Sequence, residues 1–308
     1  MARFYVVEFD EPGVLAKGKG SRNIITRLTR VLGKLGVSSE VLPFAELMAR
    51  GPAGEPQSYV LLHYNELFVV QNHKVDWLRD RETELAALGH KILHSVEQGR
   101  IVGHKVRQNK VLTAAGVPMP RLIETGSSFE TAFSNEVSNA HVPVQLVGDA
   151  AELDPGRYNT EYVDCRHEYE GELWHVCIRA QAVGEQVLFS WIRAGKEPNV
   201  RTRGTPVDAR LLNHFHTQLV RPNADQIQAI ARGVKDVLGV GFYAHDILPC
   251  AKTGRLLLCE TNFKLYEGFY RFYMKPIAAE LPNPAFFDGR KVTRRMARAL
   301  MHELRLSG

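Results

Sequence analysis

The chain has 308 residues, 44% of them hydrophobic and 24% charged, and carries a formal net charge of +5. Its length exceeds one typical domain and its composition is that of ordinary globular proteins, which excludes a disordered or fibrous chain and predicts more than one lobe. Basic residues are interspersed with acidic ones, so the excess charge does not indicate nucleic-acid binding, and no apolar run approaches the length of a membrane span.

The first third of the chain alternates β-like and helical runs, a pattern that favours an α/β sheet. Strands are predicted over residues 4–9, 37–44, 59–63 and 91–95, and helices over residues 24–35 and 76–88. The Gly- and Lys-rich loop of residues 13–21 enters the first helix without the spacing of a phosphate-binding P-loop. We therefore interpret it as an anion-tolerant flexible loop at most.

A helix with apolar periodicity is predicted from residue 104 to Gly116, and it runs into the extended segment Pro118-Met119-Pro120. Lys105 lies at the start of this helix. A helical lysine is by default a solvated charge, so any further role depends on its context.

Two segments in the middle of the chain combine strand-like residues with acids. Residues 159–164 are rich in β-forming residues, and residues 167–172 carry Glu168, Glu170 and Glu172. An exposed acidic hairpin tip accounts equally well for any one of these three glutamates, because charged residues at turns are usually only solvated.

Two strand-like runs and a basic segment follow, over residues 173–180, 184–193 and 196–205. Arg201 lies in the basic segment, and a guanidinium fork matches the geometry of phosphate oxygens. Arg193, Lys196 and Arg203 are each more simply interpreted as surface charges.

Residues 241–262 are the most informative segment, with two short apolar runs joined by a Lys-Thr-Gly turn. Glu260 and Asn262 are two residues apart, so they face the same side of a strand, and a hairpin partner brings Asp246 beside them. Carboxylate and amide oxygens suit Mg²⁺, which keeps waters and substrate phosphates in its shell. The segment predicts a Mg²⁺ site, although acids at strand ends can also be ordinary polar residues.

The C-terminal part begins with an aromatic-rich segment over residues 263–273. These aromatics either wall a substrate pocket or cover the core, with Lys264 or Arg271 available to pair with a carboxylate. The apolar spacing after residue 290 predicts an amphipathic helix with a solvated basic face.

The motifs of these segments occur in the order found in the ATP-grasp superfamily, and over residues 101–268 the chain resembles its carboxylate–amine ligases, such as the ribosomal-protein glutamate ligases and the D-alanine–D-alanine ligases. The resemblance implies an α/β protein with the ATP-grasp fold and a Rossmann-like lobe at the N-terminus. It implies ATP and Mg²⁺ as cofactors, and small-molecule carboxylate and amine substrates.

The resemblance also implies a role for particular residues. Asp246, Glu260 and Asn262 would hold the metal, and Lys105 and Arg201 would act at the phosphates, Arg201 at the γ-phosphate or the acyl phosphate made from it. Main-chain groups at Glu161, Tyr162 and Val163 would bond adenine. Glu168 would bond the ribose, with Glu170 and Glu172 as close rivals for that role.

The pattern of the superfamily is incomplete in this chain. His104 replaces the usual aspartate before the first lysine. A second lysine on a strand and the Gly-rich loop that follows it are missing from residues 141–149, which leaves their role to Gln145 or to a residue elsewhere.

The reaction implied by the resemblance is attack of a substrate carboxylate on the γ-phosphate, followed by displacement of phosphate from the acyl phosphate by an amine. Two alternatives remain open. The same site could phosphorylate a small molecule and stop, or the chain could bind nucleotide without catalysis.

Three lobes are expected: an N-terminal lobe over residues 1–100, a central lobe over 101–165 and a C-terminal lobe with the metal site over 166–308. The four cysteines lack C-x-x-C spacing and indicate reduced thiols. We expect a cytoplasmic protein with neither a membrane nor a nucleic acid as partner, and the sequence leaves a homodimer open.

Overall fold

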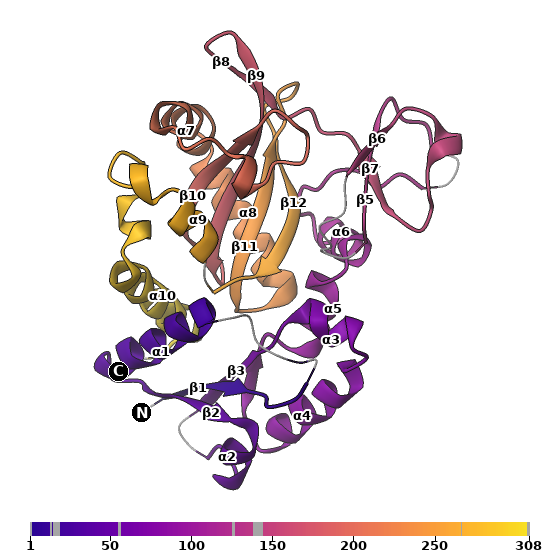
Figure 1. The fold of residues 1–308 in the computed structure, drawn as a ribbon. Helices are drawn as coiled ribbons and strands as arrows, with labels where there is room; N and C mark the ends of the chain where they lie inside the picture. The colour runs from indigo at the N-terminus through magenta and orange to yellow at the C-terminus, as the bar shows by residue number, and fades with distance from the viewer. Residues whose placement is uncertain are drawn as a thin grey trace.

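The computed structural model describes residues 2–12, 14, 19–54, 57–124, 127–137, 144–265 and 267–306. These residues form three sheets, in successive parts of the chain (Figure 1). Among the helices of the described ranges, none is long and apolar enough to cross a lipid bilayer.

The N-terminal sheet has four parallel strands in the order β2-β1-β3-β4. The strands are β1 (Arg3–Glu8), β2 (Ser38–Pro43), β3 (Ser58–His63) and β4 (Lys91–Leu93). Every residue of β3 is buried, as expected for a parallel strand that is covered on both faces. The four predicted strands are thus present, with ends shifted by one or two residues.

Helices surround this sheet: α1 (Lys19–Lys34), α2 (Phe44–Ala49), α3 (Glu66–Gln71), α4 (Val75–Ala87) and α5 (Val96–Val102). The C-terminal helix α10 (Gly289–Leu304) lies against α1 (Figure 1). The Tyr59 hydroxyl also donates to the carbonyl oxygen of Leu304 at 3.1 Å. The end of the chain therefore returns to the N-terminal sheet, which the sequence did not predict.

A large five-stranded sheet carries several of the candidate site residues. Its strands are β8 (Arg166–Tyr169), β9 (Glu172–Val183), β10 (Gln186–Gly195), β11 (Phe242–Pro249) and β12 (Leu256–Phe263). Four of them follow the order β10-β9-β11-β12, and β8 pairs with β9. The helices α7 (Ala209–Phe215) and α8 (Ala224–Leu238) contact it, and α9 (Gly268–Tyr273) follows β12.

A small antiparallel sheet in the order β6-β5-β7 lies between these two parts of the chain. It consists of β5 (Ala132–Asn135), β6 (Gln145–Val147) and β7 (Tyr158–Glu161), and it follows α6 (Lys105–Ala114) (Figure 1). Residues 162–165 connect β7 to β8 and so lead from the small sheet to the large one. The predicted helix and strand that carry Lys105 and Glu161 are therefore present.

Side chains cap part of both edges of the large sheet. Along β10, the carbonyl oxygen of Ser190 accepts from Asn283 Nδ2 at 2.8 Å and that of Ile192 accepts from the Tyr270 hydroxyl at 3.3 Å. Along β12, the backbone of Thr261 is bonded by a side chain of α6. These bonds satisfy backbone groups that an open edge would expose.

Candidate active site

A row of side chains crosses the large sheet on one face. Asp246 on β11 is paired in register with Glu260 on β12 and with Arg179 on β9, and Arg179 is paired with Trp191 on β10. Directly opposed residues of antiparallel strands project to the same face with Cα atoms about 4.5–5.5 Å apart. Asn262, two residues beyond Glu260, projects to that face as well. The juxtaposition predicted for the hairpin is present, and its metal-binding role stays a prediction.

Arg179 lies between two buried carboxylates. Its Nη1 donates to Asp246 Oδ2 at 2.6 Å, and its Nε and Nη2 donate to Glu267 Oε1 at 3.0 and 2.7 Å. All three residues are less than a tenth exposed. Burial raises the pKa of Asp246 and of Glu267, but the charge of Arg179, helped by other nearby cations, outweighs burial and lowers both pKa values. Both acids are therefore carboxylates at neutral pH.

Arg193 is a mostly buried residue of the same site and not a surface charge. Its side chain is 12% exposed, and its Nη1 lies 3.3 Å from Asp246 Oδ1 and 3.4 Å from Oδ2. Its Nε is buried without a hydrogen-bond partner among the described residues. A guanidinium has five N–H donors, so Arg193 retains donors for a ligand beside Asp246.

Lys105 reaches the site from the first turn of α6. It is 7% exposed, and its Nζ lies 3.6 Å from Glu260 Oε2. Asn262 Nδ2 donates to Glu260 Oε1 at 3.2 Å. His104, which departs from the sequence pattern, caps the helix, because its Nδ1 accepts from the Arg107 amide at 3.3 Å. The structure thus brings Lys105 to the acidic hairpin.

The charges of the site favour a polyanion. Three carboxylates, those of Asp246, Glu260 and Glu267, lie among four cations. The fourth cation is Lys264, whose charge lowers the pKa of both Asp246 and Glu267. The cations exceed the anions by one charge, and they lie on a sheet face where water screens them little. Phosphate groups would therefore be stabilised at this position.

The oxygen ligands of the hairpin fit Mg²⁺. Asp246, Glu260 and Asn262 offer carboxylate and amide oxygens from adjacent strands. Within the described ranges, no cluster of three or more His, Cys, Asp and Glu side chains has metal-binding geometry. Mg²⁺ suits such a sparse set, because it usually takes one or two carboxylates and completes its shell with phosphates and water.

The connection between β7 and β8 presents main-chain groups where adenine binding was predicted. The Glu161 amide donates to Arg121 O and the Tyr162 amide to Thr131 O, both at 2.9 Å. The Glu161 carboxylate pairs with the guanidinium of Arg121. Among the described residues, the Val163 amide has no backbone partner, and neither have the amides of Asp164 and Cys165. The connection therefore has backbone donors free for a base, and Val163 is the one of them that the sequence predicted.

The three candidate ribose acids lie in one hairpin. Glu168 is exposed on β8 opposite Leu173, whereas Glu170 and Gly171 form the two-residue turn, with φ of 52° and 78°. Positive φ at both turn positions is typical of a type I′ hairpin. Glu172 binds Lys196 Nζ at 2.9 Å. Glu168 is thus the one acid on the strand that leaves the connection, and its ribose role stays a prediction.

Arg201 and Gln145 lie outside the contacts of the acidic row. Arg201 is exposed at the start of a short 3₁₀ turn. The amide oxygen of Asn199 faces Arg201 and accepts hydrogen bonds from its Nη2 at 2.8 Å and its Nε at 3.2 Å. Gln145 is exposed at the start of β6, and residues 141–143 lie outside the described residues. The phosphate roles considered for both residues stay predictions.

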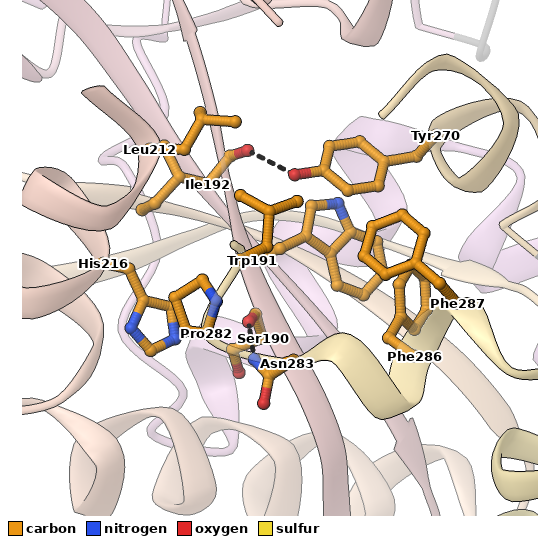
Figure 2. Close-up of a pocket in the computed structure, with 11 residues that line it drawn as sticks. Ser190, Trp191, Ile192, Leu212, His216, Tyr270, Pro282, Asn283, Phe286 and Phe287 are labelled. Atoms are coloured by element: carbon orange, nitrogen blue, oxygen red, sulfur yellow. Dashed lines mark hydrogen bonds between the residues drawn. The ribbon is translucent and has the colours of Figure 1, made fainter. Parts of the chain in front are cut away.

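The aromatic-rich segment after β12 is partly in the core. Tyr270 and Trp191 line a cavity with mostly apolar walls beside β10, together with Phe286 and His216 (Figure 2). The Arg271 guanidinium donates to Phe287 O at 2.8 Å. The segment therefore anchors α9 on the sheet, and its residue 266 lies outside the described residues.

Sequence reasoning missed Arg179, Arg193 and Glu267 as site residues. Arg179 and Arg193 each lie within an apolar strand run, and a charge at such a position is seldom buried without a partner. That signal was available. Glu267 had no comparable signal, because its contact with Arg179 joins residues 88 positions apart in the sequence.

Comparisons with known proteins identify the fold. No protein-family model matches the sequence, and no curated protein matches it. Among solved structures, D-alanine–D-alanine ligase from Bacillus anthracis has a TM-score of 0.53 at 14% identity, and the match covers 100% of both chains.

Two further solved structures give the same result. The ATP-grasp ligase PsnB has a TM-score of 0.53 at 12% identity, with 98% of both chains covered. N5-carboxyaminoimidazole ribonucleotide synthetase from Thermotoga maritima has a TM-score of 0.52 at 14% identity, with 92% of this chain and 77% of that chain covered. The α/β chain described here has the ATP-grasp fold.

Proposed function

We propose that the protein is an ATP- and Mg²⁺-dependent ligase that activates a small-molecule carboxylate as an acyl phosphate and joins it to an amine. The observation that carries this proposal is the convergence of Lys105, Arg179 and Arg193 on the paired carboxylates Asp246 and Glu260. Cations around oxygen ligands are the arrangement that phosphoryl transfer needs. The solved structures of this fold that are named as ligases support the proposal.

In this proposal the side chains contribute mainly by position and charge. Asp246, Glu260 and Asn262 would hold Mg²⁺, and the metal would supply positive charge that stabilises the transferring phosphoryl group. Lys105 and Arg193 would bind oxygens of that group from two sides. Arg179 keeps Glu267 as a partner, so it holds its place when Asp246 turns to another cation.

The adenine would lie against Tyr162 and Val163, with the Val163 amide donating to the base and Glu168 bonding the ribose. The connection between the two sheets and the free Val163 amide support this placement. We expect a crystal structure with an ATP analogue to show the base within hydrogen-bond distance of Val163 N. A base bound on another segment would contradict the placement.

Two substitutions test whether Arg193 or Arg201 binds the transferring phosphate. Arg193→Lys should lower the rate of ADP release by at least about tenfold, because lysine keeps the charge but loses the fork that spans two oxygens. Arg201→Lys should have a smaller effect, since Arg201 is exposed and bonds Asn199. Steady-state rates and ATP affinities of both variants provide the measurement.

The outcome of that comparison can also support the original assignment from the sequence. A larger rate loss in Arg201→Lys, with unchanged ATP affinity, would restore Arg201 as the residue that steadies the acyl phosphate. Arg203→Lys is the control for charge in the basic segment, because Arg203 lies over the Phe269 ring.

The reaction class can be tested before the substrates are known. We expect Mg²⁺-dependent ADP release in a screen of amino acids, small peptides and hydroxy acids, with mass analysis of the products. Added hydroxylamine should then yield a hydroxamate, because it captures an acyl phosphate. ADP release without a hydroxamate would indicate a kinase, and no ADP release with any compound would indicate a nucleotide-binding protein.

A further inference from the structure

One buried side chain joins α6 to the strand that carries Glu260. Gln108 is 1% exposed. Its Nε2 donates to Thr261 O at 2.9 Å, and its Oε1 accepts from Thr261 N at 2.8 Å. Two residues opposed on antiparallel strands exchange this pair of bonds, so a single side chain takes the place of a neighbouring strand at the edge of β12.

The position of this link matters because of its neighbours in sequence. Thr261 lies between Glu260 and Asn262, whose side chains project to the site. Lys105 lies three residues before Gln108, so both are on the same side of α6. The link thus sets the height of α6 along β12, and with it the 3.6 Å distance from Lys105 Nζ to Glu260 Oε2.

The next residue of α6 makes bonds in another direction. Asn109 Nδ2 donates to Pro120 O at 2.9 Å and to the Tyr158 hydroxyl of β7 at 3.1 Å. Tyr158 starts the strand that leads to residues 161–163. Through these two side chains, α6 is fixed both to the metal-site strand and to the strand before the proposed adenine connection.

We propose that Gln108 is a positioning residue that holds Glu260 and Asn262 in place for the metal and keeps Lys105 beside them. The inference rests on the proposed function of this site. Without the Gln108 side chain, the Thr261 N–H and C=O lose their partners in a buried place, and the edge of β12 must move to satisfy them. The ligand oxygens on either side of Thr261 move with it.

The test measures metal binding and does not need the substrates. Mn²⁺ affinity is measured by electron paramagnetic resonance in the presence of a non-hydrolysable ATP analogue. Gln108→Met, which keeps the length of the side chain, should weaken Mn²⁺ binding by about tenfold or more, as loss of outer-shell support typically does. Hydrogen exchange at the Thr261 amide should become faster in the same variant.

Gln98→Met is the matched control. Gln98 lies on the neighbouring helix α5, accepts from the Ser95 amide and donates to Leu238 O, so the same substitution also removes two partly buried bonds to the backbone. We expect this variant to lose thermal stability without a change in Mn²⁺ affinity. Gln108→Glu is a second test if Gln108→Met folds poorly, since glutamate can accept from Thr261 N but cannot donate to Thr261 O.

The outcomes separate the inference from the proposed function. If the Gln108 variants bind Mn²⁺ with wild-type affinity while Glu260→Gln does not, Gln108 has only a structural role and the metal site stands. If Glu260→Gln also keeps wild-type affinity, the metal site itself is wrong. Equal weakening in the Gln98 and Gln108 variants would overturn the inference as well, because it would indicate general loosening.

Discussion

Replacing Glu260 by Gln is expected to lower Mg²⁺-dependent ADP release by at least about 100-fold, because losing a direct metal ligand costs at least as much as losing its outer-shell support. The amide keeps the size of the side chain, and its oxygen can still accept the hydrogen bond from Asn262 Nδ2, so the fold should be retained. The measurement is ADP release across a Mg²⁺ titration, with circular dichroism as the check on folding.

Glu46→Gln is the matched control for this prediction. Glu46 is an exposed glutamate of α2, and its partner is Arg50. Its substitution should leave ADP release unchanged, because exposed ion pairs contribute little. Undiminished activity of Glu260→Gln over the whole Mg²⁺ range would remove Glu260 from the metal site and leave the hairpin a structural feature.

The sequence predicted the elements that depend on local patterns. Alternation and turn residues located β11 and β12, and the two-residue spacing of Glu260 and Asn262 gave their common face. The glycines Gly89 and Gly116 predicted where α4 and α6 end. Both glycines have positive φ and lie two residues after the last helical residue. These features are set by a few neighbouring residues, which a single sequence displays.

The contacts that complete the site are long-range, and the sequence does not display them. Gln108 reaches Thr261 across 153 positions, and Arg179 reaches Asp246 across 67. Each contact depends on which strands are neighbours, and strand order is decided by packing of the whole sheet. The amphipathic helix α10 was predicted from its local spacing. Its position beside α1 was not predicted, because that contact is also long-range.

Arg179→Met is expected to lower the free energy of unfolding by about 3–5 kcal/mol, because it removes one partner of a buried charge cluster and leaves carboxylates behind. Arg179 and its partners Asp246 and Glu267 are all less than a tenth exposed, so water screens the remaining charges poorly. Urea unfolding at neutral pH provides the measurement. Arg166→Met is the control. The exposed Arg166 at the start of β8 donates two hydrogen bonds to the Asp164 carboxylate, and its loss should change the free energy of unfolding little.

A second substitution, Glu267→Gln, should have opposite effects on stability in the wild-type protein and in the Arg179→Met variant. Glu267→Gln is expected to destabilise the wild-type protein, because Arg179 loses a charged partner. In the Arg179→Met variant the same change should raise stability, because it removes a buried carboxylate that has lost its arginine. Additive losses in the double variant would show that Arg179 and Glu267 are not coupled, contrary to their 2.7 Å contact.

The loss caused by Arg179→Met should depend on pH in a defined direction. In the wild-type protein the pKa values of Asp246 and Glu267 are lowered from 3.8 and 4.5, so their stabilising effect is complete above these values and is lost as the pH falls through the folded-state pKa values. Without Arg179, burial raises both pKa values, so the variant is penalised fully at high pH and recovers as its carboxyls take up protons. The difference in free energy of unfolding between the two proteins should therefore be smaller at pH 5 than at pH 7.5. These conditions lie about one and about three pH units above the usual pKa values of aspartate and glutamate. A gap that stays constant between these two conditions would mean that the carboxylates find other cations, with Arg193 and Lys264 as the first to examine.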